Sequence, residues 1–294
     1  MTAQMRSWLV VPADQPDKLE KVVGLDADVI LLDLSCVAES GKADARALTA
    51  EFLGSRPAPR GGLPGARRWV RINPLGTAHW REDLVALMPG VPDGIMLPRA
   101  TGAADITQLA AEIYELEQKT PAELNSVRIV PQVGDTPAAA LAIADLVRDL
   151  HPRLAGLSWD ADAMLASGGM RPFGKGVRRW PAPLGHVRAS VVLAARANGL
   201  FALETPSNVT RDADIFRAVA TEARAAGFDA MIARHPAQVK PIEEIFAPTD
   251  EERSRAAAII AAFELQPEVQ VVTVDRFAAD RIELARARRI VGEI

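Results

Sequence analysis

The apolar run DVILLDL, residues 28–34, ends beside several side chains that could do chemistry. It carries Asp33 near its carboxyl end, and Ser35 and Cys36 follow directly. An acid at the end of a buried strand is often placed for catalysis. A nucleophilic thiol would need a neighbouring base, and the sequence shows none, so Cys36 is most simply interpreted as a small buried residue.

A second candidate is Arg71, near the end of the apolar segment WVRIN, residues 69–73. Burying an arginine without a partner is costly. Its planar guanidinium can form two parallel hydrogen bonds with a carboxylate. Two interpretations therefore stay open. Arg71 binds the carboxylate of a substrate, or it forms a structural ion pair with Asp33 on a neighbouring strand.

Acids near the ends of the apolar runs could hold a divalent cation. They are Asp33, Asp135, Asp160, Asp162 and Glu204. A hard cation such as Mg²⁺ prefers two or more converging oxygens. Each acid taken singly is about as often a helix N-cap, and Asp135 and Asp160 both stand where a helix could begin.

Eight short apolar runs predict the strands that would position these residues. They cover residues 7–12, 28–34, 69–73, 93–98, 127–133, 154–159, 200–205 and 228–233. Most are continuous, as is typical of strands covered on both faces. Eight strand–helix units in about 235 residues favour an α/β fold, the (β/α)8 barrel, whose active site lies at the carboxyl ends of the strands. The competing fold is a doubly wound open sheet, but no glycine-rich turn follows the first run.

Helical patterns lie between most of these runs. Asp105, Thr136 and Thr210 are the predicted N-caps, and Gly227 is predicted to close a helix. Two irregular segments, residues 54–68 and 167–185, are expected to be loops, the second on the catalytic face.

The pattern changes near residue 247. We therefore expect a barrel over residues 1–247 and an extension over residues 248–294, with a helix, a strand or hairpin arm, and a final helix. This extension is expected to be a lid or an oligomer contact.

Composition narrows the classes of function. The chain has 294 residues and a net charge of −4, so neither nucleic acid nor an anionic membrane surface is an expected partner. It has one cysteine, which rules out an internal disulfide and indicates a cytoplasmic protein. A stretch of about 18 apolar residues is absent, so a membrane span is not expected.

Several motifs resemble one family along nearly the whole chain. They include RSWLVVPADQPDKLEKV, VILLDLSCVAESGKADAR, VRINPLGT, DGIMLPRATGAADI and GFDAMIARHPAQVKPIEEIF. These resemble the citrate lyase β-subunit and malyl-CoA lyase group of the 2-keto-acid aldolase superfamily. The resemblance implies a barrel with a C-terminal extension, assembled as a trimer or hexamer. It also implies Mg²⁺-dependent cleavage or formation of a carbon–carbon bond β to a CoA or acyl-carrier thioester.

The resemblance assigns roles to basic residues. Arg71 matches the arginine that grips the substrate carboxylate in VRIN, and Asp33 is the retained acid beside it. Arg6, Lys18 and Lys21 are similar in place to residues that hold CoA phosphates, although Gln15 stands where the family has arginine. For Lys18 and Lys21, solvated surface charge is the alternative.

The chain departs from the family at its acids. Ser35 and Cys36 stand where the family motif LDLEDAV has two acids. In the metal motifs Asp135 takes the place of a glutamate, and Ala163 takes the place of the aspartate, with Asp162 one position earlier. The resemblance thus implies an Mg²⁺ site formed by Asp135 and Asp162, and we expect it to bind the ion weakly.

Two functions remain possible. The first is a carbon–carbon lyase that cleaves a small carboxylated hydroxy acid, or its CoA thioester, through a stabilised enolate. We expect such a lyase to have little activity on citryl or malyl thioesters. The second is a catalytically impaired paralogue that binds an organic acid or acyl-CoA, or serves as a subunit of a larger assembly.

Overall fold

The computed structural model describes residues 5–22, 25–55, 65–148, 150–171 and 180–292. The central parts of the two predicted loops, residues 56–64 and 172–179, lie outside this range. The chain divides into two compact units. One contains Arg6–Ile245, and the other contains Phe246–Ile294 together with Met1–Met5.

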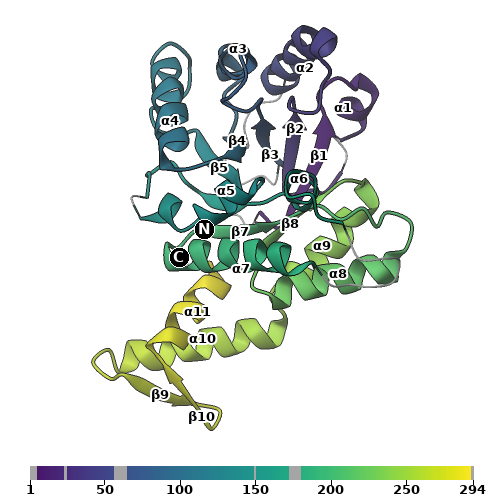
Figure 1. Cartoon of the computed structure of the whole chain (residues 1–294). Coiled ribbons are helices and arrows are strands. Elements are labelled where there is room, and N and C mark those ends of the chain that lie inside the picture. The colour runs from purple at the N-terminus through teal and green to yellow at the C-terminus, as the bar shows by residue number, and fades with distance from the viewer. Residues whose placement is uncertain (1–4, 23–24, 56–64, 149, 172–179, 293–294) are drawn as a thin grey trace. The chain divides into compact units, whose positions relative to one another are not determined.

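The larger unit is a closed barrel of eight parallel strands, arranged in sequence order (Figure 1). The strands are β1 Ser7–Pro12, β2 Val29–Asp33, β3 Arg67–Arg71, β4 Gly94–Ala100, β5 Arg128–Val133, β6 Gly156–Ser158, β7 Phe201–Glu204 and β8 Ala230–Ala233. Pairing of β1 with β8, in which Ser7 lies opposite Met231, closes the barrel. The predicted (β/α)8 fold is confirmed, and each predicted apolar run overlaps one strand.

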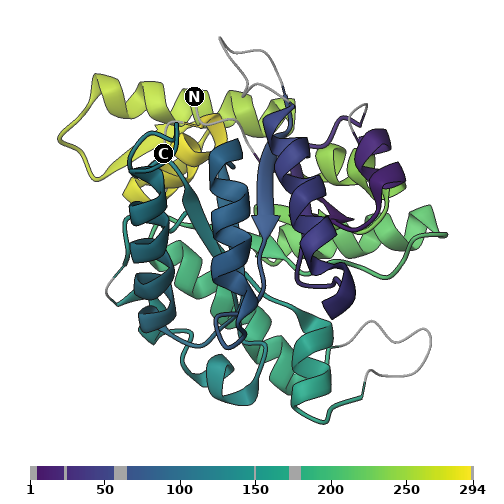
Figure 2. The same ribbon diagram turned by 90° about the horizontal axis from the view of Figure 1, so that it is seen from above.

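Helices cover the outside of the barrel. They are α1 Pro16–Val22, α2 Lys42–Gly54, α3 His79–Leu87, α4 Ala103–Glu117, α5 Pro137–Leu141, α6 Ala161–Ser167, α7 Ala182–Ala197, α8 Ala213–Ala225 and α9 Val239–Phe246. Helices α2, α3 and α4 pack side by side along one flank (Figure 2). No helix among the described residues is long and apolar enough to cross a membrane.

Two of the four predicted helix ends are confirmed and two are wrong. Thr136 caps α5 by accepting a hydrogen bond from the Ala139 amide, and Gly227 follows α8 with a φ of 102°. Asp105 lies inside the first turn of α4, which begins after Gly102, and its carboxylate accepts a hydrogen bond from the Thr101 amide outside the helix. Asp212, rather than Thr210, caps α8 through the Ile215 amide.

Large aromatic rings fill the barrel near the amino ends of its strands. The rings of Trp8 on β1 and Trp69 on β3 lie 4.9 Å apart, and Phe201 on β7 packs against Trp8. A Cβ atom at Gly94 would come within 2.4 Å of the Trp69 ring, so only glycine fits beside it. Polar side chains at the opposite ends of the strands therefore lie above an apolar floor.

The smaller unit has its own core. It contains α10 Asp250–Leu265, β9 Val271–Val274, β10 Phe277–Asp280 and α11 Arg281–Val291. The predicted order of a helix, a hairpin arm and a final helix is therefore present. Ile259, Phe263 and Leu284 are among the buried residues that hold these elements together.

Candidate active site

Asp33 and Arg71 form an ion pair at the carboxyl ends of two neighbouring strands. Each ends its strand, β2 or β3, and the two residues are partners in the register. Arg71 Nε donates to Asp33 Oδ1 at 2.9 Å, and Arg71 Nη2 donates to Asp33 Oδ2 at 2.5 Å. The structural ion pair of Arg71 with Asp33, one of the two interpretations of the sequence, is therefore present. The Arg71 side chain keeps 14% of its surface exposed in this pair.

Both members of this pair are held in their charged forms. Burial acts to raise the pKa of Asp33, but the charge of Arg71 and the hydrogen bonds from Arg71 and Ser35 outweigh it and lower that pKa. Burial acts to lower the pKa of Arg71, but the charge of Asp33 outweighs it and raises that pKa. The two charges therefore stabilise each other out of water.

Ser35 supports the carboxylate of Asp33. Its backbone amide and its hydroxyl donate to Asp33 Oδ1 at 3.0 and 2.6 Å. A glutamate at this position, as in the family motif, would have no hydroxyl to donate and would add a second negative charge. The hydroxyl after the strand thus helps to fix the carboxylate that orients Arg71.

The prediction that Cys36 is buried is wrong, because the residue is exposed. The chain turns directly after Asp33, and Val37 takes the buried position instead. Partial burial of the sulfur and the charge of Asp33 raise the pKa of Cys36 to about 12. The thiol is therefore protonated at neutral pH and has little nucleophilic character.

Gln132 and Ser158 extend the polar cluster across the barrel. Arg71 Nη1 donates to Gln132 Oε1 at 3.4 Å. Strands β3 and β5 are not neighbours, so this contact crosses the interior of the barrel. Ser158 on β6 is the register partner of Gln132.

Asp135 lies just beyond the end of β5, after Gly134, whose φ of 75° favours glycine. The Arg99 amide donates to Asp135 Oδ2 at 3.1 Å, whereas the buried Oδ1 has no hydrogen-bond partner among the described residues. Burial and the charge of Asp160 raise the pKa of Asp135 to about 7.

Asp160, rather than Asp162, acts on this cluster. Asp160 Oδ1 caps α6 by accepting from the amides of Asp162 and Ala163, and its charge also acts on Asp135 and Arg71. Asp162 is exposed and pairs with Arg234 at 3.0 Å. The structure therefore does not bring Asp162 to Asp135.

The basic residues predicted to hold CoA phosphates lie in different places. Arg6 precedes β1 at the amino ends of the strands, where it pairs with Asp28 and Glu243. That end of the barrel is opposite to Arg71. Lys18 and Lys21 are exposed on α1, which follows the carboxyl end of β1.

Glu204, at the end of β7, accepts hydrogen bonds from neighbouring side chains. Trp159 Nε1 and Arg188 Nε each donate to its carboxylate at 2.7 Å. Burial raises the pKa of Glu204 although Arg188 lies beside it. Its hydrogen bonds make it a structural acid.

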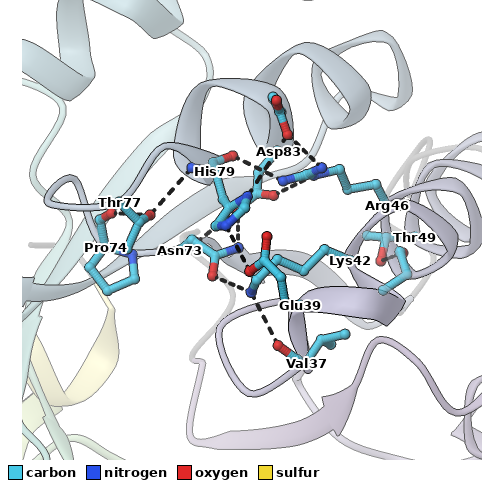
Figure 3. Close-up of polar contacts among 12 residues, drawn as sticks. Val37, Glu39, Lys42, Arg46, Thr49, Asn73, Pro74, Thr77, His79 and Asp83 are labelled. Atoms are coloured by element: carbon cyan, nitrogen blue, oxygen red, sulfur yellow. Dashed lines mark hydrogen bonds and ion pairs between the residues drawn. The ribbon is translucent and has the colours of Figure 1, made fainter.

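A buried network fixes the loops that follow β2 and β3 (Figure 3). Lys42 Nζ donates to the Val37 carbonyl at 3.1 Å and to Asn73 Oδ1 at 2.7 Å. Asn73 in turn donates to Asp83, which also accepts from Arg46. Because Val37 and Asn73 follow Asp33 and Arg71 closely in the chain, the network holds both strand ends of the ion pair.

The acids near Asp135 fit a sparse magnesium site. The described residues contain no group of three or more His, Cys, Asp or Glu that could hold a metal ion. Mg²⁺ nevertheless keeps several waters and is commonly bound through one or two carboxylates. Asp135 and Asp160 would supply two such carboxylates, and Asp135 Oδ1, which has no hydrogen-bond partner among the described residues, would be available to a cation.

The sequence predicts Asp160 either as a helix cap or as one of the acids that could hold a cation, and it does not select Gln132 or Ser158. Asp160 does cap α6, and its charge also raises the pKa of Asp135. The available signal was a polar residue near the end of each of two apolar runs, Gln132 in VRIVPQV and Ser158 in LAGLSW. Such a residue indicates a polar environment without identifying its partner.

Comparison with known proteins connects this barrel to a family. Residues 6–236 match the family model described as HpcH/HpaI aldolase/citrate lyase, and this range spans all eight strands. The L-malyl-CoA/beta-methylmalyl-CoA lyase of Cereibacter sphaeroides is 31% identical over 277 residues, covering 88% of this chain and 84% of that protein. A citrate lyase subunit beta-like protein of Mycobacterium tuberculosis is 31% identical over 260 residues, covering 87% and 84%.

Solved structures give the same result. CitE from Mycobacterium tuberculosis, in complex with magnesium, acetoacetate and coenzyme A, has a TM-score of 0.72 at 27% identity and covers 99% of this chain and 98% of its own. RipC from Yersinia pestis has a TM-score of 0.66 at 27% identity and covers 85% and 98%. The resemblance to the citrate lyase β-subunit and malyl-CoA lyase group is confirmed.

Proposed function

Because the chain belongs to the HpcH/HpaI aldolase/citrate lyase family, we propose that it is a carbon–carbon lyase. Its substrate is a small carboxylated hydroxy acid or the CoA thioester of one. The observation that carries the proposal is the guanidinium of Arg71, held by Asp33 at the carboxyl end of β3. In a (β/α)8 barrel, that end of the strands is where active sites lie.

Arg71 acts as the carboxylate anchor. A guanidinium has five N–H donors, and Arg71 uses two of them on Asp33 and one on Gln132. The remaining donors can bind a substrate carboxylate while Asp33 fixes the plane of the group. Asp33 is therefore a positioning residue, and Ser35 supports it.

The proposed reaction is a retro-aldol cleavage. The substrate hydroxyl loses a proton, and the bond between the hydroxyl-bearing carbon and its neighbour breaks. The electron pair passes to the enolate of the acid or thioester fragment, which then takes up a proton at carbon. The products are an oxo acid and a shortened acid or acyl thioester, so the step needs no oxidant and no water.

Asp135 and Asp160 would hold the magnesium ion that solved relatives contain. When bound, such an ion supplies a Lewis acid that stabilises the charge of an enolate oxygen. With only two carboxylates near it, and with Ser35 and Cys36 in place of acids, we expect the site to bind Mg²⁺ weakly.

Substrate handling and assembly follow from the same family. The CitE structure contains coenzyme A, which supports an acyl-CoA or small carboxylate as the partner of this chain. Lys18 and Lys21 are the basic residues that we assign to CoA phosphates. Arg6 is left out because its ion pairs lie at the other end of the barrel. A homo-oligomer, either trimer or hexamer, and a cytoplasmic location remain predictions.

One observation favours the second candidate, a paralogue that binds an organic acid or acyl-CoA without cleaving it. In the simplest register with the family motifs, Ser35, Cys36 and Ala163 stand where the resemblance implies three acids. A site with fewer acids attracts a divalent cation less strongly.

A product assay separates the two candidates. A panel of carboxylated hydroxyacyl-CoA thioesters, including malyl-CoA, is incubated with the protein in millimolar Mg²⁺, and any oxo acid is trapped with phenylhydrazine. We expect an oxo acid from at least one thioester, with malyl-CoA a poor substrate. Binding of the thioesters without any oxo acid would support the paralogue instead.

A further inference from the structure

Three buried polar atoms without hydrogen-bond partners gather at the carboxyl end of the barrel. Within the described part of the chain, the five buried side-chain atoms without a partner include Gln132 Nε2, Asp135 Oδ1 and Ser158 Oγ. An unpartnered buried donor or acceptor is costly and calls for an explanation. Asp135 Oδ1 belongs to the proposed magnesium site, so the two atoms that remain unexplained are Gln132 Nε2 and Ser158 Oγ.

Arg71 fixes the orientation of the Gln132 amide. A guanidinium can only donate hydrogen bonds, so the atom of Gln132 that faces it must be the oxygen, Oε1. Nε2 then keeps both of its hydrogens for another acceptor. Because Oε1 and Nε2 share one amide group, that donor and the guanidinium of Arg71 lie within reach of one small molecule.

Ser158 lies beside this donor on the next strand. It is the register partner of Gln132, and register partners in a parallel sheet project to the same face. The contact between Gln132 and Arg71 of β3 identifies that face as the barrel interior. The two residues are 1% and 0% exposed, so their donors lie in a site from which water is largely excluded.

We propose that Gln132 Nε2 and Ser158 Oγ form a neutral two-donor subsite for the oxygen next to the carboxylate held by Arg71. The ligand class is a small 2-oxo or 2-hydroxy carboxylate. The inference rests on the carboxylate role proposed for Arg71 and adds two specificity residues to it. A site built to donate to a ligand oxygen rejects an analogue without that oxygen, since its donors are then left unpaired.

The matched ligands for a test are pyruvate and propanoate, which differ by one oxo oxygen. Ligand-observed NMR titration in EDTA measures both affinities without a divalent cation. We expect the unmodified protein to bind pyruvate about tenfold more tightly than propanoate, a difference of about 1.4 kcal/mol. Ser158→Ala should lower this ratio several-fold and leave the propanoate affinity nearly unchanged, and Gln132→Met should lower the ratio as well.

Thr120→Val is the matched control. Thr120 Oγ1 is also a buried hydroxyl oxygen with no partner in the described residues, but it follows α4 rather than lining the strand ends. Its loss should leave the ratio as in the unmodified protein. Circular dichroism of each variant checks folding. The ratio of pyruvate to propanoate affinity in the unmodified protein tests the proposal even if a variant does not fold.

Several outcomes would overturn the proposal. They are a ratio near one in the unmodified protein, a ratio that Ser158→Ala and Gln132→Met both leave unchanged, and a preference for pyruvate that arises only on adding Mg²⁺. Failure of pyruvate to bind would do so as well. Arg71→Lys reports separately on the proposed function: if propanoate binds that variant as well as it binds the unmodified protein, the carboxylate anchor is wrong whatever the ratio.

Discussion

Asp33 accepts hydrogen bonds from Arg71 and from both the backbone and the side chain of Ser35. This arrangement gives the hydroxyl after β2 a physical role. The serine stabilises a buried carboxylate, and that carboxylate orients Arg71, which also donates to Gln132. Serine in place of the acid of the family motif therefore removes a negative charge and adds a hydrogen bond that supports the ion pair.

Replacing Asp33 tests the pair directly. Asp33→Asn removes the charge that balances the buried guanidinium of Arg71. Breaking one partner of a buried ion pair is strongly destabilising, so we expect the free energy of unfolding to fall by about 3 kcal/mol. Chemical denaturation measures it. The exposed pair of Asp145 and Arg148 provides the control, because Asp145→Asn should change stability by less than about 0.5 kcal/mol. Equal effects of the two substitutions would contradict the account.

Cys36 should be unreactive although it is exposed. With its pKa raised to about 12, the thiolate fraction at pH 8 is very small. We expect a disulfide reagent such as DTNB to modify Cys36 at least about 100-fold more slowly than it modifies glutathione. Asp33→Asn removes one cause of the raised pKa, so it should speed the reaction. A rate close to that of glutathione would show that the thiol is activated.

At the scale of single elements, the amino end of the barrel holds a second group of charges. Glu243 on α9 accepts a hydrogen bond from the Ser7 hydroxyl on β1 and pairs with Arg6, while Asp28 lies nearby. Burial, followed by the charge of Asp28, raises the pKa of Glu243 to about 7 against the effect of Arg6. This group joins α9 to the start of β1.

The raised pKa of Glu243 predicts a dependence of stability on pH. The folded state holds this proton more tightly than the unfolded state, whose pKa is near 4.5. The resulting stabilisation is complete below pH 4.5 and is lost as pH rises through 7. Glu243→Gln removes this titration, so its stability relative to the unmodified protein should rise between pH 5 and 7.5, by at most about 3 kcal/mol. Parallel stability curves over that range would contradict the prediction.

The strands were predictable because the signal for them is local. The runs 28–34 and 154–159 are mainly apolar, and such runs suit strands buried on both faces. The helix start near Thr210 was not predictable in the same way, since Asp212 is an equally good cap two residues later. Whether Thr210 or Asp212 caps the helix depends on how the helix packs.

Some residues of the site were also predictable from local sequence, and others were not. Asp33 and Arg71 were identified together because they end strands that neighbour each other in sequence order. The choice between Asp160 and Asp162 depends on where α6 begins, because that sets which acid caps the helix and which faces solvent. Gln132 and Ser158 meet only through the pairing of β5 with β6, which no local pattern encodes.

At the scale of the whole molecule, the smaller unit exposes apolar side chains. Phe277 on β10 and Ile282 on α11 are 61% and 76% exposed, and β9 pairs only with β10 among the described strands. Exposed strand edges and apolar side chains favour association unless they are covered. This unit is therefore the predicted contact between subunits.

We expect the protein to be an oligomer at micromolar concentration, as measured by light scattering coupled to size-exclusion chromatography. The double substitution Phe277→Ser with Ile282→Ser should reduce the mass of the particle or weaken the assembly. The same pair of changes at Val85 and Leu193, which are exposed on barrel helices α3 and α7, provides the control. A monomeric unmodified protein would contradict the prediction.

In the proposed function, the site breaks a carbon–carbon bond in a substrate anchored by Arg71. The most direct measurement is the stoichiometry of products from the best thioester of the panel, determined by mass spectrometry for the unmodified protein and for Arg71→Lys. The account predicts one oxo acid for each shortened acyl-CoA, and a roughly 30-fold loss of kcat/KM in Arg71→Lys, which corresponds to about 2 kcal/mol for a charged hydrogen bond. Release of free CoA by thioester hydrolysis, or an Arg71→Lys variant as active as the unmodified protein, would contradict it.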